Sequence, residues 1–129
     1  MPENPADGDP GSLLADLTAR VPGARSAALI AAHGMVITEH GLGTDAADQL
    51  GAIVSVMWMH ARKASVIFGG EGRVRQVAVD GEDFMLHTAA AGTAILAVLA
   101  DRETDAAMLG TEMRWIAQAV RPREPAGPC

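Results

Sequence analysis

Residues 45–64, DAADQLGAIVSVMWMHARKA, predict a long helix that carries apolar side chains on two faces. One apolar stripe repeats at three- and four-residue spacing, which is typical of the face that a helix buries in its own domain. We expect this stripe to pack on a sheet. Its members are Ala46, Leu50, Ile53, Val54, Met57, Ala61 and Ala64.

The opposite face of the same helix is also apolar. Ala52, Val56 and Met59 gather there, and Trp58 lies on one flank near Arg62. A helix on the surface of a small domain is normally polar on its outer side. Either these side chains contact another protein, or small Ala and adaptable Met are simply tolerated in water. A Trp exposed beside Met and Val would form a large apolar patch, which favours the contact.

The segments on either side of this helix predict one α+β domain with the element order α-β-β-α-β-β-β-α. Turn residues separate runs of apolar residues, and capping residues precede the helical patterns. The expected elements are a helix from Ser12 to Val21, a hairpin of 25–32 and 35–39, the helix 45–64, strands at 74–79, 84–89 and 93–100, and a last helix capped by Thr104 or Asp105.

Both ends of the chain are rich in Pro and Gly. Such segments bury too little apolar surface to fold. We therefore expect disordered tails at 1–11 and 122–129 around a domain at 12–121.

The strand expected at 74–79 has a weakly protected edge. It follows a Gly-rich loop, precedes the turn Asp80-Gly81, contains no Pro, and only Arg73 and Arg75 guard it. Edges of this kind pair across two-fold axes. Together with the outer helix face, this edge predicts a homodimer. The expected dimer interface comprises Ala52, Val56, Met59, Val74, Arg75, Val77 and Val79.

Composition excludes several classes of partner. The formal net charge is −6, and no cluster of Lys and Arg reverses that sign locally, so we expect no nucleic-acid partner. The longest apolar run, near Ala94–Ala100, is too short to insert into a bilayer. The acidic, Pro-rich start does not resemble a secretory signal, and the single Cys129 suits a reducing compartment. These features predict a cytoplasmic protein.

No motif in the chain predicts catalysis. The four His residues lack metal-ligand spacing, and no Ser lies in a nucleophile-elbow motif. The loop Gly69–Gly72 lacks the Lys-Ser/Thr of a phosphate loop and precedes a strand instead of a helix. We expect no catalytic, metal or cofactor site and no enzyme. A site assembled at the dimer interface is the remaining route to an enzyme.

The ordered set of motifs resembles the roadblock (dynein light chain) family, in particular the bacterial branch found in conservon operons. The similarity extends over about 12–120, the whole predicted domain. The residues that carry it are Leu13-Leu14-Ala15-Asp16-Leu17, Arg20-Val21-Pro22-Gly23, Gly34-Met35-Val36, Gly41-Leu42, Ala47-Asp48-Gln49-Leu50, Phe68-Gly69-Gly70-Glu71-Gly72, Val74-Arg75-Gln76, Leu96-Ala97-Val98-Leu99-Ala100 and Glu112-Met113.

The resemblance implies a five-stranded antiparallel sheet between helices, with the second helix alone on one face. It also implies dimers that join their sheets through the third strand and pack their second helices together. Conservon members are encoded with a sensor-kinase-like protein and a Ras-like small GTPase, and other bacterial members stimulate such a GTPase. We expect Trp58, Met59 and Arg62 to contact that GTPase. The alternative function is a small-molecule sensor that uses the sheet or the dimer interface as a pocket.

Overall fold

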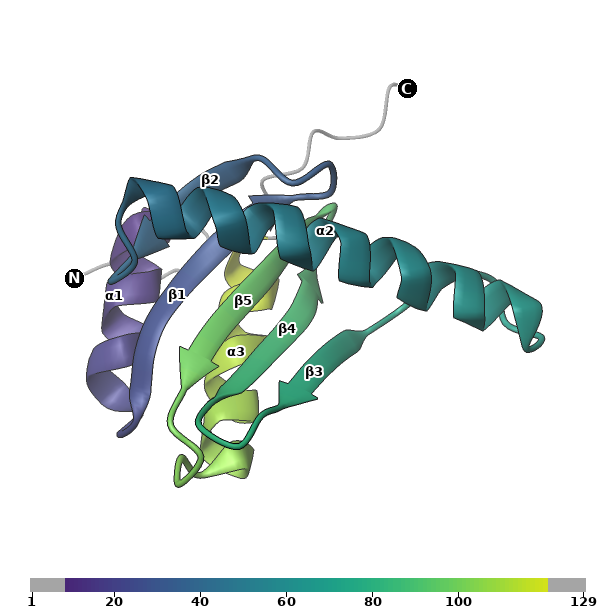
Figure 1. Ribbon diagram of the computed structural model, residues 1–129. Helices are drawn as coiled ribbons and strands as arrows, with labels where there is room; N and C mark the ends of the chain where they lie inside the picture. Colours follow the sequence, from purple (N-terminus) through teal and green to yellow (C-terminus); the bar gives the residue numbers. More distant parts are fainter. Residues whose placement is uncertain (1–8, 121–129) are drawn as a thin grey trace.

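The computed structural model describes residues 9–120, and the predicted tails lie outside this range apart from residues 9–11. The order α-β-β-α-β-β-β-α and the single five-stranded antiparallel sheet are confirmed (Figure 1). The strands lie in the spatial order β2-β1-β5-β4-β3. The elements are α1 (Pro10–Arg20), β1 (Ala24–Ala31), β2 (Val36–His40), α2 (Thr44–Ile67), β3 (Gln76–Asp80), β4 (Met85–Ala91), β5 (Ala94–Ala100) and α3 (Ala106–Val120).

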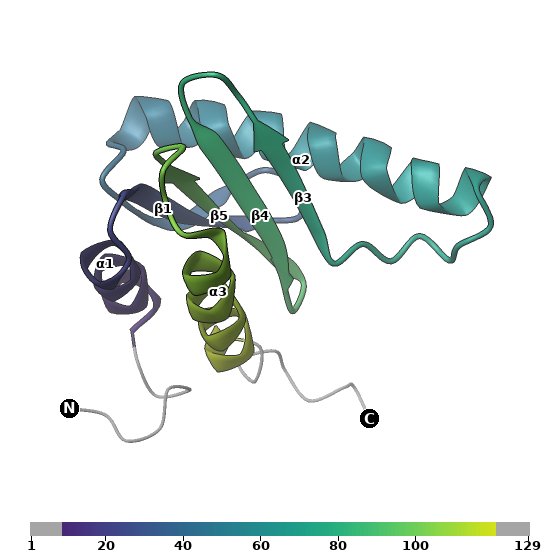
Figure 2. The same cartoon turned by 90° about the horizontal axis from the view of Figure 1, so that it is seen from below.

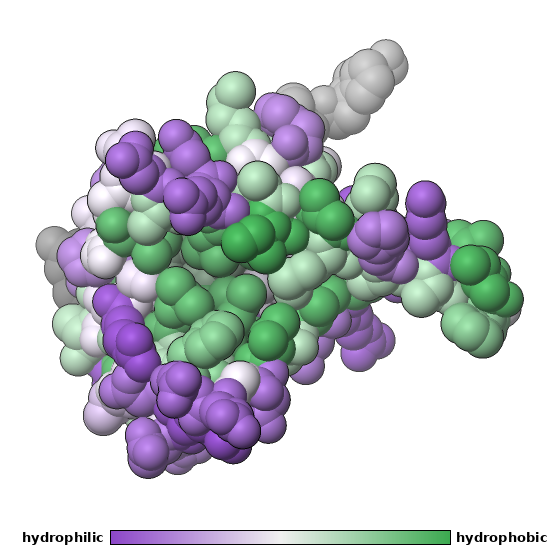
Figure 3. Space-filling view, in the orientation of Figure 1, coloured by the Kyte–Doolittle hydropathy of each residue, from purple (hydrophilic) through white to green (hydrophobic). Residues whose placement is uncertain are grey.

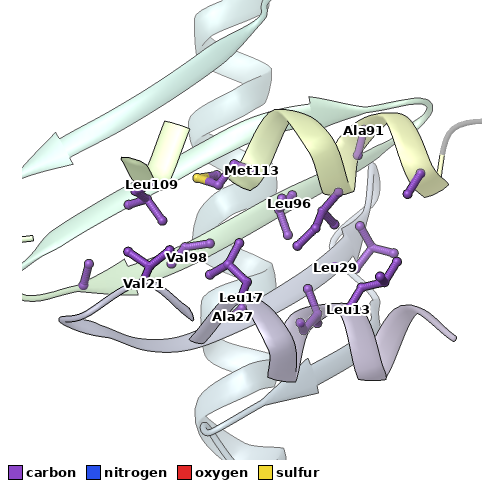
Figure 4. Packing of buried hydrophobic residues seen from close by; sticks show 14 residues of the cluster. Leu13, Leu17, Val21, Ala27, Leu29, Ala91, Leu96, Val98, Leu109 and Met113 are labelled. Carbon is purple, nitrogen blue, oxygen red and sulfur yellow. The ribbon is translucent and has the colours of Figure 1, made fainter. Parts of the chain in front are cut away.

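The sheet separates two layers of helix. Helices α1 and α3 lie side by side on one face, and α2 crosses the other face alone (Figures 1 and 2). The larger core fills the space between α1, α3 and the sheet, where Leu17, Leu96 and Leu109 are fully buried (Figure 4). A second core lies under α2 and centres on Val54, Trp58 and Ile95.

Several predicted boundaries are wrong by a few residues. Helix α1 starts at Pro10 and not at Ser12, because Asp9 is the cap and accepts a hydrogen bond from the Ser12 backbone N–H at 3.2 Å. Helix α2 continues past Ala64 to Ile67 and stops before Gly69, whose φ is +99°. Strand β3 begins at Gln76, so the residues before it belong to the connecting loop.

The buried face of α2 is rotated from the predicted one. Its buried residues are Ala47, Leu50, Gly51, Val54 and Trp58. Three residues of the predicted core stripe, Ala46, Ile53 and Ala64, are instead exposed.

Gly51 explains part of this rotation. A Cβ atom at that position would lie 2.3 Å from the Gly34 carbonyl oxygen, so only glycine lets the helix pack closely on the β1–β2 turn.

Trp58 explains the rest of the rotation. Its side chain is only 2% exposed, and its indole N–H donates a hydrogen bond to the Thr88 hydroxyl at 2.8 Å. Thr88 is itself buried on β4 and donates its hydroxyl hydrogen to the Val77 carbonyl on β3 at 2.6 Å. Burying a large ring with its polar N–H paired stabilises this rotation of α2 over the others.

We predict that Trp58→Ala lowers the free energy of unfolding by about 3–5 kcal/mol, because it empties a large space in the core. The matched control is Trp115→Ala, since Trp115 is the second Trp of the chain and is 41% exposed on α3. We expect the control to cost no more than about 1 kcal/mol. Urea unfolding measures both. Equal losses would contradict the buried position of Trp58.

Candidate interaction surface

Exposed apolar side chains lie in the middle of α2 and at its last turn. Ile53, Val56 and Met59 are 54%, 49% and 44% exposed. The helix has 24 residues and projects beyond β3, so its last turn reaches past the sheet (Figure 1). This end carries Val66, Ile67 and Phe68, and Phe68 is 86% exposed. Exposed apolar side chains on this scale favour a contact with another molecule.

The apolar surface continues from α2 onto the sheet. Because a single helix crosses this face, part of the sheet beside α2 is left uncovered, and Figure 3 shows green surface running from the helix onto the strands. Val77, Phe84 and Leu99 are only partly buried there, and Val79 on β3 is 36% exposed. We call the outer face of α2 with these sheet residues the α2 surface.

Strand β3 has a free edge. It is the last strand of the sheet and pairs only with β4 among the described residues. The Ala90 N–H donates to the Arg75 carbonyl at 2.9 Å. Because inward and outward groups alternate along an antiparallel strand, Val77 and Val79 direct their backbone groups toward β4, and Gln76 and Ala78 direct theirs to the free edge.

The structure places the predicted dimer residues in two groups. Ala52, Val56 and Met59 are exposed on α2, as the second apolar face requires, and Val77 and Val79 lie on β3 with their side chains on the same side of the sheet. Val74 and Arg75 precede strand β3, which begins at Gln76, although the Arg75 carbonyl still accepts a hydrogen bond from β4. Whether any of these residues forms a dimer contact stays a prediction.

The predicted partner residues lie together on α2, but they differ in exposure. Trp58 was expected on an exposed flank, and this is wrong because the indole is buried and hydrogen-bonded to Thr88. It cannot contact a partner in the folded chain. Arg62 lies above it, with the guanidinium carbon 5.7 Å from the ring centroid, and is partly exposed. Met59 and Arg62 therefore remain as candidates.

Ile53 and the segment Val66-Ile67-Phe68 belong to the α2 surface but were not predicted there. Ile53 fits the helical core period, so periodicity alone places it inside. The sequence does contain a signal for the segment Val66-Ile67-Phe68. An unbroken apolar run directly before Gly69-Gly70 indicates that the helix continues up to these glycines.

Among the described residues there is little support for other kinds of functional site. No three of their His, Cys, Asp and Glu side chains are placed to hold a metal ion. None of the helices in this range combines the length and the apolar character needed to cross a membrane.

Burial lowers the pKa of His87 on β4, and the nearby Asp80 carboxylate opposes this shift only in part. His87 is therefore neutral at neutral pH.

Comparison with known proteins agrees with this fold. A model of the Roadblock/LC7 domain matches residues 11–100. The crystal structure of a Roadblock/LC7 domain from Streptomyces avermitilis is 42% identical, with a TM-score of 0.86 over 90% of this chain and 98% of that one. No curated protein matches the sequence significantly. The chain belongs to the Roadblock/LC7 domain family.

More distant structures share the fold alone. MglB from Myxococcus xanthus is 14% identical, with a TM-score of 0.80 over 88% of this chain and 93% of that one. The gliding protein MglB from Thermus thermophilus is 19% identical, with a TM-score of 0.78 over 95% of this chain and 96% of that one.

We predict that Val56→Asp dissociates a homodimer, because the carboxylate would be buried without a partner. Light scattering at micromolar concentration should give twice 13.3 kDa for the wild-type chain and a mass near 13.3 kDa for the variant. The matched control is Met108→Asp on α3, since Met108 is 40% exposed outside the α2 surface. A wild-type monomer, or a Val56→Asp dimer of unchanged affinity, would contradict this prediction.

The edge of β3 can be tested separately. Ala78→Pro removes an N–H that points to the free edge and leaves the ladder to β4 in place, so we expect weaker dimerisation with little loss of thermal stability. Val77→Pro removes an N–H that points to β4 and should lower the melting temperature instead. If Ala78→Pro leaves the dimer dissociation constant unchanged, the dimer does not use this edge.

Proposed function

We propose that the chain is a homodimeric, non-enzymatic regulator or scaffold that binds a Ras-like small GTPase in a bacterial signalling complex. The observation that carries the proposal is the exposed α2 surface in a chain of the Roadblock/LC7 domain family. A sensor-kinase-like protein is the further partner that the family resemblance suggests. The single Cys129 and the acidic composition suit a place in the cytoplasm.

The overhang of α2 supports self-association. If two copies pair through their β3 edges, the partner's sheet begins where this sheet ends, and the projecting end of α2 extends over it (Figure 1). The apolar side chains of Val66, Ile67 and Phe68 would then be covered by the second copy. An MglB structure of the same fold, 21% identical, has a tetrameric arrangement, so self-association occurs on this fold.

The side chains of Met59 and Arg62 on α2 support a GTPase contact. Met59 and Arg62 lie one turn apart, and Met and Arg are enriched in the centres of protein interfaces. Arg62 is already held over the Trp58 ring, so little side-chain entropy is lost when it binds.

We predict that Arg62→Glu weakens binding to a Ras-like GTPase at least about tenfold, since a repulsive charge replaces an anchored cation. Titration calorimetry with the GTPase in its GTP- and GDP-bound forms measures the affinity. Light scattering on the same samples separates this effect from loss of the dimer. Met108→Asp, on the other face, serves as the control and should bind normally. A dimeric Arg62→Glu variant with unchanged GTPase affinity would contradict the proposed contact.

The alternative function, a small-molecule sensor, has one observation in its favour. A hollow of about 900 Å³ lies on the opposite face of the sheet. It is half-open and has charged side chains along its rim, whereas pockets for small ligands are mostly enclosed and apolar. The hollow therefore fits a different kind of ligand better.

A further inference from the structure

The face of the sheet opposite α2 carries a trough beside α3. Helix α3 lies under β5 and β4 and leaves β3 uncovered (Figure 2). The space of about 900 Å³ that results has strands β3 and β4 as its floor and α3 as one wall, and the loop before β3 closes one end. We call it the α3 trough. It is formed within one chain, so the inference does not depend on a dimer or on a GTPase.

The rim of the α3 trough is basic although the chain as a whole is acidic. Three Arg residues line it, and the formal net charge of the chain is −6. Arg73 is paired with Glu71, but Arg75 and Arg114 form no salt bridge with any acidic group in residues 9–120. Two exposed guanidinium groups beside one hollow, without an acidic partner, form a local site for carboxylates or phosphates.

The residues on the floor of the trough favour one class of anionic ligand over another. Ala78 and Ala89 on the strands and Ala117 on α3 give it a shallow apolar base, and Gln76 and Gln118 add amide groups. No Phe, Tyr or Trp side chain lines it, so apart from the His87 imidazole it offers no aromatic surface on which nucleic-acid bases could stack. A polyanion would also be repelled by the net charge of the chain. A short peptide that combines a few carboxylates with small apolar side chains carries less charge than a polyanion, so it is repelled less, and it needs no stacking surface.

We propose that the α3 trough binds an acidic, extended segment of a partner protein, with its carboxylates on Arg75 and Arg114 and its apolar side chains on the alanine floor. The trough and the α2 surface lie on opposite faces of the sheet. A segment in the trough therefore leaves α2 free, and the two partners can bind at the same time.

Fluorescence anisotropy with a labelled peptide that alternates Glu with Leu and Ala tests this proposal on the full chain. We expect saturable binding that weakens as NaCl is raised, because exposed charge pairs are screened. The double variant Arg75→Glu/Arg114→Glu should lose at least about tenfold in affinity. The control is Arg102→Glu, which reverses one Arg charge outside the trough and should bind within about twofold of wild type. A peptide with Lys in place of Glu should not bind.

The result that overturns the proposal is equally specific. Absence of binding at about 1 mM peptide, or equal affinity for the double variant and the wild type, would show that the trough is not the site. Displacement of the peptide by a nucleotide or a single-stranded oligonucleotide at equal concentration would assign the trough to phosphate ligands instead. If the double Glu variant fails to fold, Arg75→Gln/Arg114→Gln removes both positive charges without adding repulsion and should still weaken binding.

Discussion

The hydrogen bond from the Trp58 indole to Thr88 holds α2 in one rotation on the sheet, and the exposure of the other side chains of that helix follows from it. Leaving either buried group unpaired would cost about 1–3 kcal/mol, in addition to the space that a displaced ring would leave. Any other rotation that buries Ile53 or Val56 must break this contact. The burial of Trp58 on the inner face of α2 therefore leaves the apolar residues of the outer face exposed.

Thr88 extends the same constraint to the edge of the sheet. Its hydroxyl group accepts from Trp58 on α2 and donates to the Val77 carbonyl on β3, so one buried side chain connects the helix to the edge strand. The two parts of the proposed dimer interface, the outer face of α2 and the free edge of β3, are therefore held at a fixed distance from each other. A rigid, preformed surface of this kind loses little entropy when it binds.

Much of this architecture could be predicted from local patterns, and the failures share one cause. Periodicity and turn residues predict the element order, and they also indicate the second apolar face through Ala52, Val56 and Met59. Periodicity treats all apolar residues alike. It therefore does not distinguish Trp58, which fills the core, from Ile53, which is exposed. That choice depends on Thr88, which lies far along the chain. The α3 trough could not be predicted from the sequence for the same reason, since only the tertiary fold brings Arg75 and Arg114 to one rim.

The helices cover the sheet unevenly, and they cover strand β3 least. Two helices on one face protect β2, β1, β5 and β4, and one helix crosses the other face diagonally. Strand β3 is therefore only partly covered, and its edge is free (Figures 1 and 2). The side chains of Val77 and Val79 face the apolar α2 surface, whereas Gln76 and Ala78 face the basic trough. Apolar contacts depend little on salt and exposed charge pairs depend on it strongly. A single short strand thus contributes to two surfaces that ionic strength would affect in different ways.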